Sequence, residues 1–158
     1  MNSKCKSVLC LLLVIIVCSC TEVRGQKSTP TDSLLKALRT TRNDTVRSLI
    51  FASLAENYLQ RNQFDSTIRA ARAGTDASEK AGSYAAMARN LIAMSAAYMS
   101  LRQNDPAATP SLKATVMAKK AGDPELQTDA WINRGRYFRA AAQNQYALKA
   151  LENQAAEP

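Results

Sequence analysis

The feature that most constrains this fold is a self-similarity at a spacing of forty residues. Shifting the chain by that distance aligns Tyr58 with Tyr98, Gln63 with Gln103, Asp65 with Asp105, Thr75 with Thr115, and Lys80-Ala81-Gly82 with Lys120-Ala121-Gly122. A second shift places Trp131, Gly135 and Phe138 under Leu91, Ser95 and Tyr98. Repeats with a period of roughly 20–50 residues are typical of arrays in which each unit packs on its neighbours. The sequence therefore predicts three copies of one structural unit.

The first part of each copy has helical periodicity. Phe51, Leu54, Ala55 and Tyr58 are spaced as one stripe of an α-helix, with Ala, Leu, Arg, Gln and Met, all good helix formers, around them. The stripe recurs as Leu91, Met94, Ser95 and Tyr98, and in a weaker form as Trp131, Arg134, Gly135 and Phe138. We interpret Trp131 and the tyrosines as core residues, in preference to a ligand cage.

The second part of each copy predicts another helix with its own start and stop signals. In the first copy Asp65 or Ser66 is expected to cap the helix, and Lys80 and Gly82 to end it, because glycine tolerates the left-handed turn that closes a helix. In the second copy Asp105-Pro106 marks the start, and Pro110 predicts a later start or a kink.

Two further stretches predict helix starts. Asn43 or Asp44 is expected to cap the helix before Phe51, in preference to serving as a glycosylation sequon with Thr45. Asp123-Pro124-Glu125 is expected to begin the third copy with a cap, a proline and an early acid.

These signals predict an all-α protein. A polar linker is expected over 26–31, a short leading helix over 32–42, and helix pairs over 45–81, 85–120 and 125–155. The last pair is short and has no polar capping helix after it, which favours a truncated or fragmentary protein; the alternative is a small complete protein that caps itself or pairs with another chain. The repeat domain is expected to be monomeric or weakly self-associating.

Residues 1–25 predict a secretory signal peptide. An apolar run from Val8 to Cys18 follows Lys4 and Lys6, and it is shorter than the roughly 20 residues that a membrane-spanning helix needs. Cleavage after Gly25 is the preferred interpretation. Lipidation at Cys20, within a stretch that resembles a bacterial lipobox, and retention as an uncleaved anchor remain alternatives.

The composition of the chain excludes several kinds of chemistry. It has no histidine, and its four cysteines all precede residue 21, so cleavage at either position leaves no thiolate or imidazole for catalysis or metal binding. Removal of residues 1–25, with Lys4, Lys6 and Arg24 against Glu22, lowers the net charge from +8 to +6. Because the charges are interspersed and the glycines isolated, we expect no enzyme activity, no cofactor, no metal and no nucleic-acid partner.

The spacing of these residues resembles that of tetratricopeptide repeats over about 32–155. The positions that carry the resemblance are Phe51, Leu54-Ala55, Tyr58, Phe64 and Thr67; Leu91, Met94-Ser95, Tyr98 and Ala107; and Trp131, Gly135, Phe138 and Ala147. The repeat here is forty residues rather than the family's usual 34 or so, a long form that resembles the sensor regions of exported bacterial signalling proteins. The resemblance implies an α-solenoid, a right-handed superhelix with a concave face.

The resemblance also implies which residues line the concave groove. By position these are Glu56, Gln60, Arg89, Ser100, Asp129, Asn133, Arg136 and Arg139. The last four could clamp a peptide carboxylate or an acidic segment; ordinary solvent-facing polar residues are the alternative. The first two grooves are expected to be small and apolar, and could bury another helix. Their residues are Ala52, Leu59, Ile92, Ala93, Ala96 and Met99.

Two functions remain open on this basis. The first is an exported, non-catalytic scaffold that binds a protein or peptide on its concave face, as the sensory N-terminal part of a larger or truncated signalling protein. The second is a stand-alone structural or assembly protein of the cell envelope. Both functions place the chain in a bacterial periplasm or on the periplasmic face of a membrane. A missing downstream segment would tether the sensor, and a lipid would tether the stand-alone protein.

Overall fold

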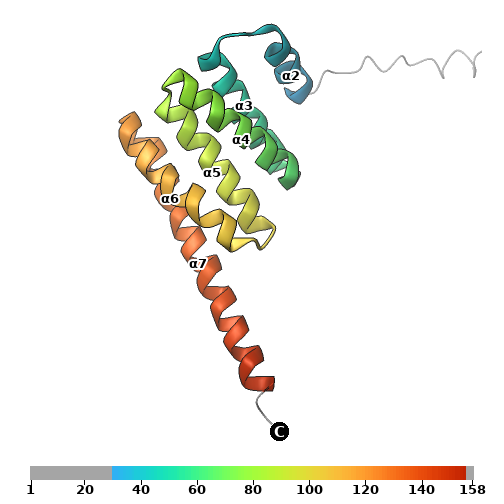
Figure 1. The fold of residues 1–158 in the computed structure, drawn as a ribbon, viewed down its shortest axis with the longest axis vertical. Coiled ribbons are helices and arrows are strands. Elements are labelled where there is room, and N and C mark those ends of the chain that lie inside the picture. The colour runs from blue at the N-terminus through green and yellow to red at the C-terminus, as the bar shows by residue number, and fades with distance from the viewer. Residues whose placement is uncertain (1–29, 156–158) are drawn as a thin grey trace, which may run out of the picture.

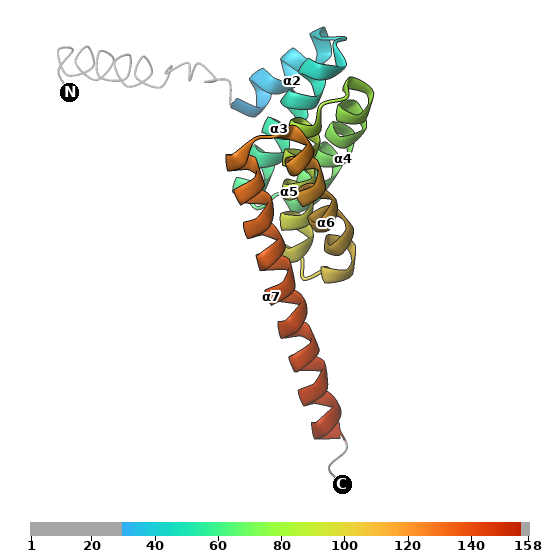
Figure 2. The same ribbon diagram turned by 90° about the vertical axis from the view of Figure 1, so that its left-hand side faces the viewer.

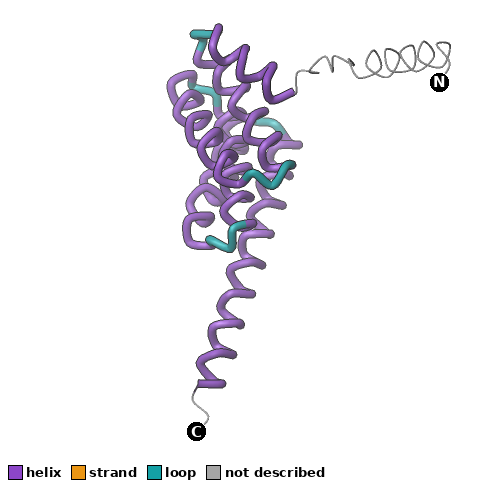
Figure 3. Tube along the Cα trace, turned by 90° about the vertical axis from the view of Figure 1, so that its right-hand side faces the viewer, coloured by secondary structure: helices purple, strands orange, loops and turns teal. Residues whose placement is uncertain are grey.

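The computed structural model describes residues 30–155, with side chains up to residue 146, and this part of the chain is all helical (Figures 1 and 3). Six helices follow one another through short loops: α2 (Pro30–Thr40), α3 (Asp44–Gln60), α4 (Phe64–Ala81), α5 (Tyr84–Ser100), α6 (Asn104–Ala121) and α7 (Pro124–Ala155). The forty-residue period appears directly in these bounds, because α5 and α6 begin and end forty residues after α3 and α4. The predicted all-α fold is thus confirmed.

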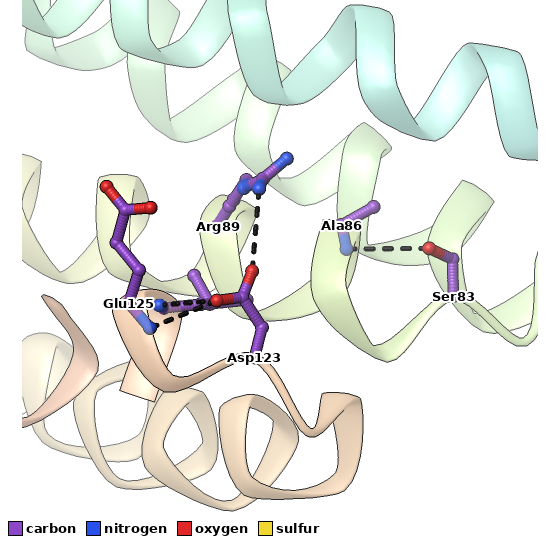
Figure 4. A network of polar contacts seen from close by, with 6 residues as sticks. Ser83, Ala86, Arg89, Asp123 and Glu125 are labelled. Atoms are coloured by element: carbon purple, nitrogen blue, oxygen red, sulfur yellow. Dashed lines mark hydrogen bonds and ion pairs between the residues drawn. The ribbon is translucent and has the colours of Figure 1, made fainter. Parts of the chain in front are cut away.

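The period also fixes the helix starts. The side chains of Asn43, Ser83 and Asp123, each forty residues from the next, cap α3, α5 and α7. Each accepts a hydrogen bond from the backbone N–H three residues on, at 3.2 Å, 3.5 Å and 3.2 Å respectively. Figure 4 shows the cap by Ser83 and the side chain of Asp123. Such caps satisfy amide groups that a helix leaves unpaired at its first turn. The predicted caps at Asn43 and Asp123 are confirmed.

The turns inside and between the helix pairs repeat as well. Asn62 and Arg102 both have φ of 58°, and Gly82 and Gly122 have φ of 64° and 72°. Each therefore supplies the left-handed residue that reverses the chain, a conformation that glycine and asparagine adopt most readily. The predicted glycine stops are confirmed. The predicted caps of α4 are wrong, because Asp65 lies inside its first turn and Gln63 precedes the helix without a side-chain bond.

The packing of the helices is asymmetric. Among the described helices α3 contacts α5 and α5 contacts α7, whereas α4 and α6 make no contact with each other. The first helices of the copies therefore form one packed layer, and the second helices spread apart on the other side. We call the exposed side of α3, α5 and α7 the inner face.

Small residues let these helices approach closely. The two core clusters are rich in alanine, and Ala55, Ala71, Ala88, Ala97, Ala114 and Ala118 are all fully buried. Gly74 of α4 lies against Asn90 of α5, which is also fully buried and donates its amide to the carbonyl oxygens of Ala86 (2.8 Å) and Ser48 (3.4 Å). Asn90 thereby links α5 to α3 beneath α4.

The leading helix covers the open end of the first copy. Leu34, Leu35 and Leu38 pack on the core cluster that contains Leu54. Arg47 donates to the carbonyl oxygens of Leu38 and Thr41, each at 3.4 Å, and so satisfies acceptors at the end of α2. The helix begins two residues earlier than predicted, so Pro30 and Thr31 belong to it rather than to a linker.

The third copy differs from the prediction. A helix pair was expected over 125–155, but the structure has one continuous helix, α7, whose C-terminal part extends past the other helices (Figures 1 and 2). Where the earlier copies turn at Asn62 and Arg102, the third has Ala142 within an alanine run. Alanine is the strongest helix former, so the helix continues through the turn position.

This continuation exposes the third stripe. Trp131 and Phe138 are 59% and 53% exposed, although Trp131 was predicted to be a core residue and Phe138 belongs to the same stripe. The corresponding stripes of α3 and α5 are covered by α4 and α6, and no helix of the described chain takes that place on α7.

Pro110 was expected to delay or kink α6, but the helix begins at Asn104 and includes Pro110, so the later start is wrong. The predicted signal peptide over 1–25, its cleavage after Gly25, the lipidation at Cys20 and most of the linker lie outside the described residues.

Candidate functional site

The inner face contains a cavity of about 360 Å³ between α3, α5 and α7. It is lined by Leu49, Ala52, Ser53, Glu56, Leu59, Arg89, Ile92, Ala93, Leu126 and Asp129. Each of the three helices that form the packed layer contributes residues, so the cavity depends on the stacking of successive copies.

The forty-residue register explains why these residues meet. Leu49, Arg89 and Asp129 occupy the same position in the three copies, one helical turn before Ser53, Ala93 and Asn133. Residues at one position of stacked repeats form a row across the inner face. The row thus changes from apolar on α3 to basic on α5 and acidic on α7, and Glu56 of α3 adds a second carboxylate to the lining.

The charges around the cavity are unequal. Glu56 and Asp129 bring two carboxylates to the lining, and Arg89 brings one guanidinium. A further carboxylate compensates that guanidinium, because Arg89 Nη2 lies 4.0 Å from Asp123 Oδ2 (Figure 4). Both side chains of this pair are partly exposed, so the pair is screened by water and weak. The cavity therefore has an excess of negative charge beside apolar side chains.

Three of the predicted groove residues, Glu56, Arg89 and Asp129, lie together in this cavity. The prediction is wrong for Asn133, which is only 2% exposed and has no hydrogen-bond partner for either amide atom among the described residues. Gln60, Arg136 and Arg139 are exposed but are not part of the lining. The four α7 residues expected to clamp an acidic group are thus not gathered at one cavity.

The apolar residues predicted for the first two grooves do not all lie in one cavity. Ala52, Leu59, Ile92 and Ala93 line the cavity on the inner face. Met99 and Ser100 instead line a second cavity of about 310 Å³, between the α5–α6 turn and α7, together with Arg102, Asn104, Ala140, Gln143 and Asn144. There Asn104 Nδ2 donates to the carbonyl oxygen of Ala140 at 3.0 Å. Ala96 lines neither cavity.

Sequence reasoning missed three lining residues, Leu49, Ser53 and Leu126. A signal for Leu49 and Ser53 was present, because they share the register of Arg89 and Ala93, whose place in the groove was predicted. Leu126 lies in the first turn of α7 and is 3% exposed, and no repeat position indicated that the start of a helix would close the cavity.

Within residues 30–155 the structure has no group of three or more acidic, histidine or cysteine side chains that could hold a metal ion. In the same residues no helix has both the length and the apolar character needed to span a membrane. Comparison with protein-family models, with curated proteins and with solved structures found no match.

Proposed function

We propose that this chain is an exported, non-catalytic scaffold whose helix pairs are tetratricopeptide-like and form a right-handed α-solenoid. Its inner face is then the concave binding surface, and the cavity between α3, α5 and α7 holds part of a protein or peptide partner. The exact forty-residue spacing of the helix bounds supports this reading of the repeats. The cavity, which residues of three successive first helices form together, carries the proposal of binding.

The chemistry of the cavity favours a particular kind of peptide. Glu56 and Asp129 attract a cation, and Arg89 is already within 4.0 Å of Asp123. Leu49 and Ile92 offer apolar surface in the same lining, and Leu49 is 44% exposed. A segment with a lysine or arginine next to an apolar residue matches both features, because the charges set orientation and the apolar contact supplies affinity. We therefore propose a basic–apolar segment as the ligand.

In the biological setting we propose, the chain is the sensory N-terminal part of a larger or truncated signalling protein in a bacterial periplasm or on the periplasmic face of a membrane. The alternative is a stand-alone envelope protein, with a lipid on Cys20 as its tether. An immunoblot of fractionated cells separates the two. A membrane-bound product well above 17.2 kDa supports the sensor, and a product no larger than this chain contradicts it.

The binding proposal is tested by nitrogen-15 NMR titration of the protein with two hexapeptides, acetyl-Gly-Ser-Lys-Leu-Ser-Gly-amide and the same peptide with Glu in place of Lys. The lysine peptide should shift amide signals in the cavity lining of α3, α5 and α7, and the glutamate peptide should shift them far less. Glu56→Gln and Asp129→Asn should each weaken the lysine peptide by about twofold to fivefold, as expected for partly exposed ion pairs.

Matched controls are available on α4. Glu79→Gln and Asp76→Asn remove the same charges from exposed positions outside the cavity, and should leave the affinity unchanged. Equal binding of both peptides, equal effects of cavity and control variants, or signal shifts confined to other helices would each contradict the proposed site.

A further inference from the structure

The helix cap at Asp123 carries a charge that the equivalent caps do not. Asn43, Ser83 and Asp123 occupy the same position in the three copies, and each accepts the backbone N–H three residues on. An amide oxygen or a hydroxyl oxygen therefore suffices for this cap in the first two copies. The helix dipole favours a negative charge at this end, but α3 and α5 begin without one at their caps. Asp123 thus has a second oxygen and a charge that capping does not require.

The two carboxylate oxygens of Asp123 have separate partners (Figure 4). Oδ1 accepts hydrogen bonds from the backbone N–H groups of Glu125 and Leu126, at 3.0 Å and 3.2 Å. Oδ2 faces Arg89 of α5, whose Nη2 lies 4.0 Å away. Because the two bonds at Oδ1 already fix the side chain, Oδ2 is held in place for Arg89 with little further loss of side-chain entropy.

Arg89 has a second carboxylate nearby. Asp129 lies at the same repeat position on α7, the next helix of the packed layer, and both residues line the cavity on the inner face. Axes of packed helices are about 8–10 Å apart, a distance that an arginine side chain can bridge. The guanidinium pairs with Asp123 instead. Among the residues that the structure describes, the carboxylates of Glu56 and Asp129 have neither an ion pair nor a hydrogen bond.

We propose that Asp123 sets the charge preference of the cavity by holding Arg89 away from Asp129. This inference rests on the proposed binding of a basic–apolar segment, because it concerns the charges that such a segment meets. While the cap holds Arg89, Glu56 and Asp129 are both open to a cation of the ligand. When Arg89 is released, its guanidinium turns to Asp129 and takes the place of that cation. Asp123 is therefore a positioning residue, which acts through Arg89 and does not itself line the cavity.

Solvent limits the size of this effect. The side chains of Arg89 and Asp123 are 53% and 38% exposed, so water screens their attraction. Ion pairs of this kind change an equilibrium by a small factor, roughly twofold to fivefold. We therefore expect Asp123 to tune the affinity of the cavity for a cation by that factor, and not to switch binding on or off.

The first test needs no ligand. In NMR spectra of the nitrogen-15-labelled full-length protein, the Nε–H signal of Arg89 reports the surroundings of its guanidinium. Asp123→Asn keeps an oxygen for the cap, as Asn43 does in α3, and should move this signal. Adding Asp129→Asn to that variant should move the signal again. Asp129→Asn alone should leave it unchanged, because Arg89 is then still held by Asp123.

Two outcomes of this test would overturn the proposal. The Arg89 signal could ignore Asp123→Asn, or respond equally to Asp129→Asn with and without Asp123. In the Asp123→Asn background it could respond to Glu125→Gln in place of Asp129→Asn, which would show that the released guanidinium turns outside the cavity lining. Both readouts are decisive whether or not a peptide binds.

The second test is a double-mutant cycle with the two hexapeptides of the binding experiment. Asp123→Asn should weaken the lysine peptide by about twofold to fivefold and narrow its advantage over the glutamate peptide. In an Arg89→Gln background the same substitution should have no effect, because the guanidinium that it releases is absent. Equal effects in both backgrounds would show that Asp123 acts through its own charge, against the positioning role.

Matched variants control for the cap and for charge in general. Asp123→Ser supplies the kind of cap that Ser83 gives α5, so it should behave as Asp123→Asn does and keep the helical circular dichroism. Weaker binding that follows a loss of helical signal would assign Asp123 to capping alone. Asp105→Asn removes an exposed acid from the first turn of α6, outside the cavity lining, and should change neither readout. A lysine peptide that fails to bind the natural chain contradicts the proposed function, while the Arg89 signal still decides this inference.

Discussion

The contact between Gly74 and Asn90 makes a stability prediction that runs against helix propensity. In an isolated helix, Gly74→Ala would be stabilising by about 1 kcal/mol. In this fold a Cβ at position 74 would lie 2.5 Å from Asn90 Cγ and 2.6 Å from Asn90 Nδ2, inside a fully buried contact. Asn90 must move, and its bond to the Ser48 carbonyl oxygen, already 3.4 Å long, is the first to break.

The size of the effect follows from these terms. Inserting a methyl group into a packed core costs about 1–3 kcal/mol, and a buried amide that loses a partner costs about 1–3 kcal/mol. Against these stands the gain of about 1 kcal/mol in helix propensity. We expect Gly74→Ala to lower the free energy of unfolding by about 2 kcal/mol, which corresponds to a fall of about 8 °C in Tm for a domain of this length.

The next copy offers an internal test, because it has Ala114 and Ala130 in place of Gly74 and Asn90, and both are fully buried. The double variant Gly74→Ala/Asn90→Ala reproduces that pair and should be more stable than either single variant. Asn90→Ala alone leaves a void beside Gly74, which the second alanine fills.

Urea unfolding followed by circular dichroism at 222 nm gives the four free energies of this double-mutant cycle. We expect a coupling energy of about 2 kcal/mol between the two positions. A Gly74→Ala variant as stable as the natural chain, or single-variant effects that simply add, would refute the argument that this contact limits the approach of α4 to α5.

Three further changes test other features, each by urea unfolding. Asn133→Ala should raise the free energy of unfolding by about 1 kcal/mol, because it removes two buried amide atoms without partners, and a loss would contradict that assignment. Gly82→Ala and Gly122→Ala should each cost about 1 kcal/mol, because φ is positive at both and no neighbour is near; a neutral result would argue against the left-handed stop. Asn43→Ala should cost about 1 kcal/mol while Asn43→Ser should cost little, and equal losses would exclude the side-chain cap.

Much of the candidate site was predictable because it depends on register. The resemblance to tetratricopeptide repeats implied that Glu56, Arg89 and Asp129 lie on the groove, and they line one cavity in the structure. Asn133 was placed there by the same reasoning and is buried. The reason is that its position faces the preceding copy: Ala93 is buried there as well, while Ser53, which has no full copy before it, is exposed.

What the sequence alone determined is local and periodic. Caps at Asn43 and Asp123, stops at Gly82 and Gly122, and the forty-residue period depend on interactions within a few residues, so their signals are complete in the sequence. From them follow an all-helical chain and the bounds of its first two helix pairs.

The tertiary structure decided what meets each helix. A stripe of apolar residues predicts a helix surface suited to burial, but it does not predict whether another helix covers that surface. For this reason the stripe of Trp131 and Phe138 was expected to be buried, although both residues are exposed. Whether the chain turns at Ala142 depends on the balance between helix propensity over 140–142 and the burial that a hairpin would bring. That balance involves residues far apart along the chain, and only the packed structure resolves it, in favour of one continuous α7.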